Sequence, residues 1–558
     1  MSLLNIFIGG ESFRELREEN CYYVDKTSFL EEMLVTIPPK VSLITRPRRF
    51  GKTLMLSMLQ EFFTIQNDSS QLFKGLAIAK NLTLCQKWMN QYPVLFITFK
   101  ELRRSNYTDL KGQLSILLSD LCLEHTYLFE SENVDVATKK RLLLLSDGTD
   151  NINAFSGAFK LFCQALHAHW SKPVILLIDE YDTPMHAVEQ HGYYHEVLEL
   201  LGNMLSAALK TNTSLKFAVL SGCLPVAQAS ILTGLNNFKC YGISDVQYSD
   251  KFGFTRQEVG QFLQAAALAK QAGAIQEWYD GYLFGDNTKV YCPWDVILYI
   301  SDLQRDALAQ PLAYWKETSE NSIVKIFMEQ ASLATRQKIE ALVAGKSIKT
   351  KIDDYLSSEN IYRNEDTIWT ILYHTGYLTK CSRQDTNNLT LLRIPNREVL
   401  TIFIEKVEEW FSEAMKKNDL QNLVNALWQA DAQLLQRLLT RRLYDSISYF
   451  DYSENYYHDF MVGLLRGAGL ELSSKAEDGL GRPDLRIEDV KHARAIIIAI
   501  KQAKNFDDLP DEAEAGLRQL KEQKYAQGFS SLMKEILAYG IAFWKKEAYV
   551  RTEKCVKE

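Results

Sequence analysis

Three consecutive residues, Gly51, Lys52 and Thr53, have the types and order needed to bind a phosphate group. They follow a short apolar run, 41–44, typical of a buried parallel strand, and precede a segment, 54–63, with apolar residues at helical spacing. The N–H groups at such a helix N-terminus lack intrahelical partners, and the helix dipole adds positive character. Lys52 can then reach the terminal phosphates of a nucleotide, and Thr53 can ligate Mg²⁺. The loop residues expected to hold ATP are Arg48, Arg49, Phe50, Gly51, Lys52 and Thr53.

The loop departs at one position from the usual phosphate-loop pattern, G-x-x-x-x-G-K-[ST]. Arg46 stands where that pattern has glycine. Taken alone, the run 46–53 is therefore also compatible with a basic turn that caps an ordinary helix, and a second motif has to distinguish the two interpretations.

A pair of acidic residues supplies the second motif. Val174–Ile178 is an unbroken apolar run typical of a central parallel strand, and Asp179 and Glu180 follow it directly. Asp179 is suited to complete a Mg²⁺ shell, and Glu180 to polarise a water for in-line attack on a γ-phosphate. The alternative interpretation is that these acidic residues merely end a strand at the surface.

Further strands are predicted at 93–99, 215–221 and 238–243, so one strand lies between the two phosphate-site strands along the chain. This order resembles the additional-strand class of P-loop ATPases, which places a polar sensor residue at the end of the next strand. Ser221 fits that role. We therefore expect an α/β fold whose N-terminal region is a P-loop ATPase with a parallel sheet.

Length and composition indicate a multidomain protein. With 558 residues, three or four domains of ordinary size are expected. A hydrophobic content of 46% with 24% charged residues is typical of a soluble globular chain, and no apolar stretch approaches the ~20 residues that span a bilayer. The N-terminal residues lack the features of a secretory signal and the nine cysteines are scattered, so free thiols in a reducing cytoplasm are expected. A net charge of −7 argues against a uniformly basic nucleic-acid-binding protein.

The chain has no internal repeat and no low-complexity linker, so the predicted domain boundaries follow from motifs and shifts in pattern. Residues 1–250 hold the nucleotide motifs, residues 251–445 are mainly helical, and residues 446–558 return to an α/β pattern. Helices are predicted over 256–270, 320–340 and 394–444. An aromatic cluster, 278–282, is expected either to pack in this middle region or to contact a base, a partner or nucleic acid.

A series of motifs resembles those of prokaryotic proteins in which an AAA-ATPase-like N-terminal region is fused to a C-terminal nuclease of the PD-(D/E)xK superfamily. The motifs are Tyr22 to Thr27, Arg46 to Thr53, Ile178 to Asp182, Gly234 to Asn237, Phe252 to Thr255, Trp278 to Tyr282 and Gly376 to Leu378. Arg46 matches this family's own version of the loop. The resemblance implies that Asp25 and Lys26 lie near the nucleotide. It also leads us to expect a basic residue where the chain has Pro225, so no arginine sensor is expected there.

The C-terminal segment has the element order of a nuclease core, α-β-β-β-α-β. The predicted elements are a helix over 454–467, strands over 470–475, 482–487 and 495–501, a helix over 511–526 and a strand over 536–550, with a hairpin at 478–481. In such a site, an Asp after the hairpin and a Glu two residues before a Lys share one face of the sheet and hold Mg²⁺. Asp484 and Lys501 stand in these places, but the position of the glutamate is occupied by Ala499.

Loss of one of two carboxylates should severely weaken metal binding and water activation. Three interpretations stay open: the domain is naturally inactive and binds DNA only, a carboxylate has moved elsewhere, or Ala499 is an introduced substitution that inactivates a nuclease. The candidates for a displaced carboxylate are Glu454, Glu488, Glu512 and Glu514. The basic residues of this stretch, which form either a solvated rim or a phosphate-contacting surface, are Lys475, Arg482, Arg486, Lys491, Arg494, Lys501 and Lys504. Gln519 and Tyr525 match the family's helix after the catalytic strand and are expected to assist substrate contact.

We therefore expect a protein that binds and hydrolyses ATP with Mg²⁺ and engages DNA through a C-terminal restriction-endonuclease-like α/β domain. The expected catalytic residues are Glu180 for ATP, and Asp484 with Lys501 at the incomplete nuclease site; the expected metal ligands are Thr53, Asp179 and Asp484. An ATP-driven nuclease, a non-cleaving DNA-binding motor and a nucleotide-gated switch that binds a protein partner remain competing functions. No membrane contact is expected, and the oligomeric state is left open, a homo-oligomer included.

Overall fold

The computed structural model describes residues 3–104, 106–149, 151–188, 193–225, 238–315, 333–353, 365–381, 389–414, 419–445, 454–474, 484–523, 529 and 533–555. The chain divides into two compact units. The first comprises Met1–Ile323 with Gly345–Ile402, and the second comprises Val324–Ala344 with Phe403–Glu558. The division into three domains at residues 250 and 445 stays a prediction.

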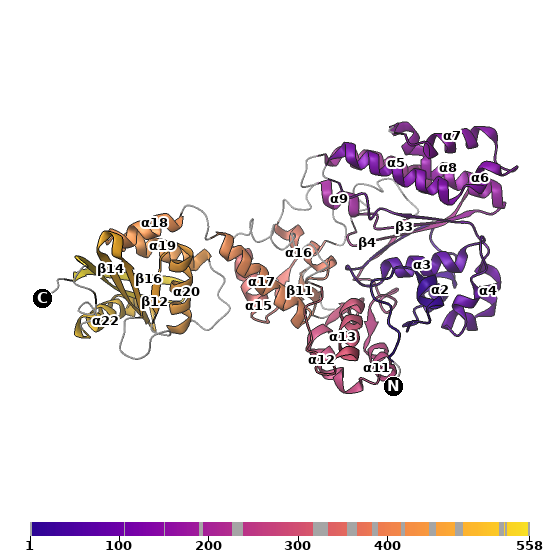
Figure 1. Cartoon of the computed structure of the whole chain (residues 1–558). Helices are drawn as coiled ribbons and strands as arrows, with labels where there is room; N and C mark the ends of the chain where they lie inside the picture. Colours follow the sequence, from indigo (N-terminus) through magenta and orange to yellow (C-terminus); the bar gives the residue numbers. More distant parts are fainter. Residues whose placement is uncertain are drawn as a thin grey trace. The chain divides into compact units, whose positions relative to one another are not determined.

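A five-stranded parallel sheet forms the centre of the first unit (Figure 1). Its strands are β1 (Val41–Thr45), β2 (Val94–Thr98), β3 (Val174–Asp179), β4 (Leu215–Gly222) and β5 (Phe238–Tyr241). They lie in the order β2-β3-β4-β1-β5, so β4 separates the strand before the phosphate loop from the strand that ends in Asp179. The predicted parallel sheet is confirmed, and the carboxyl ends of β1, β3 and β4 meet at one edge.

Helices cover both faces of this sheet because successive apolar side chains of each strand point to opposite faces. Leu176 and Leu220 belong to the core on one face, whereas Leu177 and Val219 belong to the core on the other. The first face is covered by α5 (Tyr107–Glu124), α7 (Val136–Ser146), α8 (Ile152–Trp170) and α10 (Tyr194–Leu209), and the second by α1 (Phe13–Glu18), α2 (Ser28–Leu34), α3 (Lys52–Phe63) and α4 (Leu82–Trp88) (Figure 1). Two short helices, α6 (Tyr127–Glu130) and α9 (Thr183–Val188), complete this part.

The rest of the first unit contains helices, as predicted, and also two small antiparallel sheets. The helices are α11 (Arg256–Ala265), α12 (Ala272–Tyr279), α13 (Pro293–Arg305) and α16 (Glu365–His374). The sheets have the orders β6-β8-β7 and β10-β11-β9, formed by β6 (Phe254–Thr255), β7 (Tyr282–Phe284), β8 (Thr288–Tyr291), β9 (Ile348–Thr350), β10 (Thr379–Lys380) and β11 (Thr390–Arg393). Within the aromatic cluster 278–282, Tyr279 and Tyr282 are buried and serve as core residues.

A mixed five-stranded sheet forms the centre of the second unit, in the order β12-β13-β14-β15-β16. Its strands are β12 (Leu472–Ser474), β13 (Leu485–Asp489), β14 (Arg494–Gln502), β15 (Glu535–Trp544) and β16 (Glu547–Cys555). The helices are α15 (Leu333–Val343), α17 (Arg397–Ala414, which begins in the first unit), α18 (Asp419–Trp428), α19 (Ala432–Asp445), α20 (Glu454–Gly467) and α22 (Leu509–Glu522). Helices α18, α19 and α20 pack on one face of the sheet and α22 on the other.

The prediction of one strand over 536–550 is wrong. This segment forms the antiparallel pair β15 and β16, joined by a turn at Lys545, whose φ is 51°. The apolar residues Ala548 to Val550 follow β15 after a short charged turn, so the sequence pattern does not separate the two strands. The predicted helix over 320–340 lies partly outside the described residues, and the predicted hairpin at 478–481 lies entirely outside them. No helix of the described segments is long and apolar enough to cross a membrane.

Two carboxyl groups lie together in the interior of the helical part of the first unit. Asp295, in the first turn of α13, is 1% exposed, and Glu398, in the first turn of α17, is fully buried. One oxygen of Glu398 accepts a hydrogen bond from the Trp315 N–H at 2.8 Å. Burial, with the neighbouring charge of Asp295, raises the pKa of Glu398 far above its usual range. The Glu398 carboxyl group is therefore protonated at neutral pH and can donate to Asp295.

Glu398→Gln should stabilise the protein relative to wild type at alkaline pH. A carboxyl group whose pKa is raised on folding contributes fully to stability only below its unfolded-state pKa of about 4, and this contribution is lost as the pH rises toward the folded-state pKa. The glutamine amide loses no proton, still accepts from Trp315 and can donate to Asp295. The melting temperature of the variant minus that of wild type should therefore increase between about pH 5 and about pH 9.

Glu277→Gln is the matched control, because Glu277 is an exposed carboxylate that pairs with Arg397 in the same part of the unit. Its melting-temperature difference should stay constant over this pH range. A constant difference for Glu398→Gln as well would show that Glu398 is ionised in the folded protein.

Candidate functional site

The phosphate loop connects the end of β1 at Thr45 to the start of α3 at Lys52. Gly51 caps the helix with a φ of 82°, a left-handed conformation that favours glycine. Lys52 is buried, and its Nζ donates to the carbonyl oxygens of Arg46 at 3.1 Å and Pro47 at 3.0 Å. The ammonium group is thus held inside the loop, next to the unpaired N–H groups of the helix N-terminus.

Asp179 joins the loop to the neighbouring strands. The Thr53 hydroxyl donates to one oxygen of its carboxylate at 2.7 Å, and the Ser221 hydroxyl donates to the other. Burial raises the pKa of Asp179, while these two hydrogen bonds act in the opposite direction. Three residues predicted from separate motifs are therefore brought into direct contact at the carboxyl edge of the sheet.

Glu180 follows Asp179 in a strained backbone conformation, with a φ of 52°. The Thr183 hydroxyl donates to its Oε2 at 2.6 Å, which fixes the direction of the carboxylate. Burial would lower the pKa of Lys52, but Cys223, Glu180 and the nearby acidic groups outweigh it, so the pKa is raised. Lys52 is therefore positively charged, and the nearby carboxylate of Glu180 contributes to its raised pKa.

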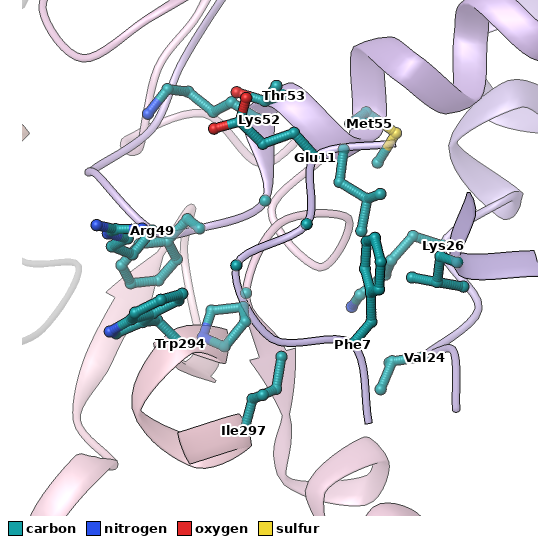
Figure 2. A pocket seen from close by; sticks show the side chains of 18 of the residues that line it. Phe7, Glu11, Val24, Lys26, Arg49, Lys52, Thr53, Met55, Trp294 and Ile297 are labelled. Atoms are coloured by element: carbon teal, nitrogen blue, oxygen red, sulfur yellow. The ribbon is translucent and has the colours of Figure 1, made fainter. Parts of the chain in front are cut away.

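A cavity of about 420 Å³ opens beside the phosphate loop, a size typical of small-ligand sites. Figure 2 shows Lys52 and Thr53 toward one end and Trp294 and Ile297 toward the other. Among its lining residues are Arg48, Arg49, Phe50, Gly51, Lys52, Thr53, Glu180, Lys26, Phe7, Glu11, Val24, Lys100, Arg103, Trp294 and Ile297. One wall is thus polar and largely cationic, and the other is apolar and aromatic, as a phosphorylated ligand with an aromatic ring would require.

Several lining residues were not singled out from the sequence. Lys100 and Arg103 follow β2, so they enter at the same carboxyl edge as Asp179, and this position after a predicted parallel strand was the available signal. Lys100 Nζ pairs with Glu11 at 2.7 Å. The Arg49 guanidinium lies over the Trp294 ring, 4.2 Å from its centroid. No local pattern indicates that Trp294 is part of the site.

The two residues implied by resemblance at 25 and 26 differ in their placement. Asp25 accepts hydrogen bonds from the Thr27 N–H at 2.9 Å and the Ala77 N–H at 2.7 Å, so both of its oxygens hold the backbone. Lys26 lines the cavity, but its Nζ pairs with Glu258 at 2.7 Å. Their roles in nucleotide binding stay predictions.

The residues around Asp179 fit a Mg²⁺ ion. Proteins commonly hold Mg²⁺ through one or two side-chain oxygens, with phosphate and water oxygens completing the shell. Thr53 and Asp179 supply a hydroxyl and a carboxylate whose oxygens are 2.7 Å apart. Clusters of three or more His, Cys, Asp or Glu side chains that could hold a metal by themselves do not occur among the described residues.

The nuclease-like site in the second unit is incomplete. Leu485 pairs with Ile498 in antiparallel register, so Asp484 falls opposite Ala499 and on the same face of the sheet. Lys501 shares this face, and Asp484 accepts from the Ile500 N–H at 2.8 Å. Ala499 is 1% exposed beneath α22. One carboxylate and one lysine do not fit a nuclease Mg²⁺ site, which needs at least a second acid.

Helix α22 distinguishes two of the candidates for a displaced carboxylate. Lys521 pairs with Glu553 on β16, and Glu514, two turns earlier, lies on that side of the helix. A Cβ on Gly516 would lie 3.4 Å from the Ala499 side chain, and Glu512 is one turn before Gly516. Glu512 is therefore on the β14 side of the helix, as is Gln519.

The remaining residues predicted in the C-terminal segment form ion pairs, are exposed, or lie outside the described residues. Arg486 pairs with Glu488 at 2.6 Å, and Arg494 pairs with Asp489 at 2.9 Å. Lys491 and Lys504 are exposed. Lys475, Arg482, Tyr525 and the side chain of Glu454 lie outside the described residues.

Comparisons with known proteins match both ends of the chain. Residues 7–232 match the AAA-ATPase-like family, described as "Predicted AAA-ATPase", and residues 452–553 match the PD-(D/E)XK nuclease superfamily. An uncharacterized protein in the vnfD 5' region of Azotobacter chroococcum mcd 1 is 26% identical over 560 residues, covering 97% of each chain. The ORC2 protein of Aeropyrum pernix, in ADPNP-ADP complexes, covers 72% of this chain and 96% of its own at 14% identity, with a TM-score of 0.24. A structural likeness of that size carries no conclusion.

Proposed function

Because the chain joins an AAA-ATPase-like region to a PD-(D/E)XK nuclease-superfamily region, we propose that it binds and hydrolyses ATP and couples the nucleotide state to DNA contact by the C-terminal domain. The observation that carries the ATP proposal is the contact of Thr53 and Ser221 with Asp179 at the N-terminus of a helix that begins with Lys52. The proposed organisation is an ATPase domain over residues 1–250, a helical region over 251–445 and a nuclease-like domain over 446–558.

In this proposal the phosphates of ATP lie against Gly51, Lys52 and Thr53, where N–H groups and the Lys52 ammonium group face the cavity. The base extends toward the apolar wall that includes Trp294 and Ile297. Arg48 and Arg49 are the further positively charged loop residues that line the cavity. Binding is then driven by charge at one end and by burial of the aromatic base at the other.

Glu180 is the proposed residue that orients the attacking water, because it follows the Asp179 strand end and lines the cavity. Thr183 holds its carboxylate by a 2.6 Å hydrogen bond. Lys52, with Lys100 and Arg103 at the same edge, is suited to stabilise the negative charge that develops on the transferred phosphoryl group. Thr53 and Asp179 would hold Mg²⁺, which would supply further neutralisation of the phosphate charge.

For the C-terminal domain we propose DNA contact without cleavage, since Asp484 is the one motif acid beside Lys501 and position 499 is apolar. The exposed Lys491 and Lys504 provide charge for phosphate contacts. An active nuclease would need the second acid from another element, and Glu512 on the β14 side of α22 is the candidate that the helix geometry favours. If Ala499 is an introduced substitution, the expectation for the present sequence is the same: DNA contact without cleavage.

Lys52→Ala and Glu180→Gln should separate ATP binding from turnover. Removing the Lys52 ammonium group should lower ATP affinity at least about tenfold, because its charge faces the β- and γ-phosphates. Glu180→Gln keeps the shape of the side chain without its charge, so it should bind ATP with Mg²⁺ normally but lose about 10²-fold in turnover. Calorimetric titration and a phosphate-release assay, with and without DNA, measure the two quantities.

Lys140→Ala is the control for the first variant, because Lys140 is an exposed residue of α7 and is not among the cavity-lining residues. It should leave both affinity and turnover unchanged. Wild-type affinity in Lys52→Ala would rule out this loop as the ATP site, and wild-type turnover in Glu180→Gln would move the catalytic role to another residue. An ATP turnover rate that is unchanged by DNA but changes on addition of a protein partner would favour the nucleotide-gated switch.

Ala499→Glu should restore metal-dependent DNA cleavage, because the new carboxylate lies on the same strand face as Lys501 and opposite Asp484. The tight packing beneath α22 should cost about 1–3 kcal/mol of stability. Nicking of single-stranded, duplex or branched DNA with Mg²⁺ or Mn²⁺ is the measurement. Adding Asp484→Ala should abolish the cleavage.

Ala499→Gln is the matched control, since it adds the same volume without a carboxylate and should not cut DNA. If Ala499→Glu folds as well as Ala499→Gln and binds DNA but never cuts it, the domain is a naturally non-catalytic DNA-binding domain. If the unmodified chain already cuts DNA, a displaced carboxylate completes the site, and Glu512→Gln should then remove the activity.

A further inference from the structure

Arg46 occupies the loop position where the usual phosphate-loop pattern has glycine, yet its side chain does not line the cavity described above. We infer that Arg46 is a positioning residue, whose buried guanidinium group holds the phosphate loop in the conformation that binds phosphates by tying it to the segments around Tyr241, Tyr248 and Phe284. This inference rests on the proposed ATP function, because it concerns the same loop.

The guanidinium group is fully buried and bonded to three backbone carbonyl groups. Its Nη1 donates to the Thr45 oxygen at 2.8 Å and to the Tyr241 oxygen at 2.9 Å. Its Nη2 donates to the Tyr248 oxygen at 3.0 Å. These carbonyls belong to the end of β1, the end of β5 and the segment that follows β5, so one side chain fixes three backbone segments relative to one another.

Two aromatic rings enclose the same cation. The guanidinium carbon lies 5.0 Å from the centroid of the Phe252 ring and 5.5 Å from that of Phe284. Burial lowers the pKa of Arg46 to about 10, so the group remains charged at neutral pH. Phe284 also contacts Phe50 of the loop, at 5.2 Å between ring centroids. The rings and carbonyls thus replace water around a cation that would otherwise be costly to bury.

The backbone of Arg46 connects this anchor to the phosphate site. The Arg46 N–H donates to the Gly222 oxygen at 3.1 Å, immediately after Ser221 on β4. The Arg46 oxygen accepts from Lys52 Nζ at 3.1 Å. A shift of Arg46 would therefore displace Lys52, which faces the proposed phosphate site, and would disrupt the contact with β4.

Other loop side chains pack against the same part of the first unit. A Cβ on Gly376 would lie 2.9 Å from Pro47, and one on Gly253 would lie 3.1 Å from Phe50. Phe50 also meets the Tyr282 ring edge to face at 5.0 Å. With glycine at 46, the carbonyl groups of Thr45, Tyr241 and Tyr248 would lose the hydrogen bonds that the guanidinium group donates. The loop would no longer be tied to these segments, so its conformation would be more flexible and phosphate binding would weaken.

The test compares the affinities of the full chain for ATP and for adenosine, whose ratio reports the contribution of the phosphates. Arg46→Met keeps much of the side-chain volume but removes all donors, so ATP affinity should fall at least about tenfold while adenosine affinity stays within about twofold. Arg46→Lys, which keeps the charge without the planar fork, should recover part of the ratio. Backbone amides of residues 46–54 should exchange hydrogen faster in Arg46→Met, whereas those of β3 should not.

Arg17→Met is the matched control. Arg17 also donates to two backbone carbonyls and, like Arg46, does not line the cavity, but these carbonyls belong to Leu72 at 2.8 Å and Lys74 at 3.1 Å, outside the phosphate loop and the segments that Arg46 holds. It should leave the ratio of affinities unchanged. If Arg46→Met does not fold, Phe252→Leu provides the second variant, because it removes one ring from the cation and keeps an apolar side chain; its ratio should fall about 2–5-fold.

An unchanged ratio in a folded Arg46→Met, or in Phe252→Leu where Arg46→Met does not fold, would overturn the inference. Tighter ATP binding by Arg46→Gly would also overturn it, since it would show that the arginine opposes the binding conformation. Failure of the ATP proposal can be distinguished from failure of the Arg46 inference. If the ATP proposal is wrong, wild type should bind adenosine and ATP with equal affinity, and Lys52→Ala should change neither affinity.

Discussion

A single buried carboxylate, that of Asp179, accepts hydrogen bonds from two hydroxyl groups, and the geometry of the proposed nucleotide site depends on this contact. Thr53 comes from the first turn of α3 and Ser221 from the end of β4. The contact is possible because β4 lies between β1 and β3 in a parallel sheet, so the three carboxyl ends share one edge. If other strands separated β1, β3 and β4, the loop, the acid and the hydroxyl would not meet at a common point.

Charges of both signs are buried around this point, and each is compensated by fixed partners. Lys52 is held by loop carbonyls, Arg46 by carbonyls and aromatic rings, and Asp179 by hydroxyl groups. Buried charges are tolerated in proteins when hydrogen bonds and opposite charges replace water. The chain as a whole carries a net charge of −7, so the cationic character of the cavity is a local feature that sequence totals conceal.

In the second unit, position 499 is constrained both by close packing and by the chemistry of the motif. A Cβ on Gly540 would lie 2.0 Å from the Ala513 oxygen, and a Cβ on Gly516 would lie 3.4 Å from Ala499. Helix α22 therefore approaches the sheet closely above the motif strand. Ala499 satisfies this packing, but it supplies no carboxylate opposite Asp484, at the position where the motif has glutamate. The position is thus part of the core as well as part of the motif.

The sequence by itself determined the features carried by contiguous residues: the strand, loop and helix around Lys52, the acidic strand end at Asp179, and the incomplete motif at Ala499. Uninterrupted apolar runs also indicated the parallel sheet, because buried parallel strands need apolar residues on both faces. Only the tertiary structure decided that Lys100 and Trp294 share a cavity with Lys52, that Asp295 meets Glu398, and that Arg46 points into the core. It also separated β15 from β16, which the sequence pattern predicted as one strand. The physical reason is that local patterns report which residues are buried, whereas strand order and helix packing, set by long-range contacts, determine which buried residues meet.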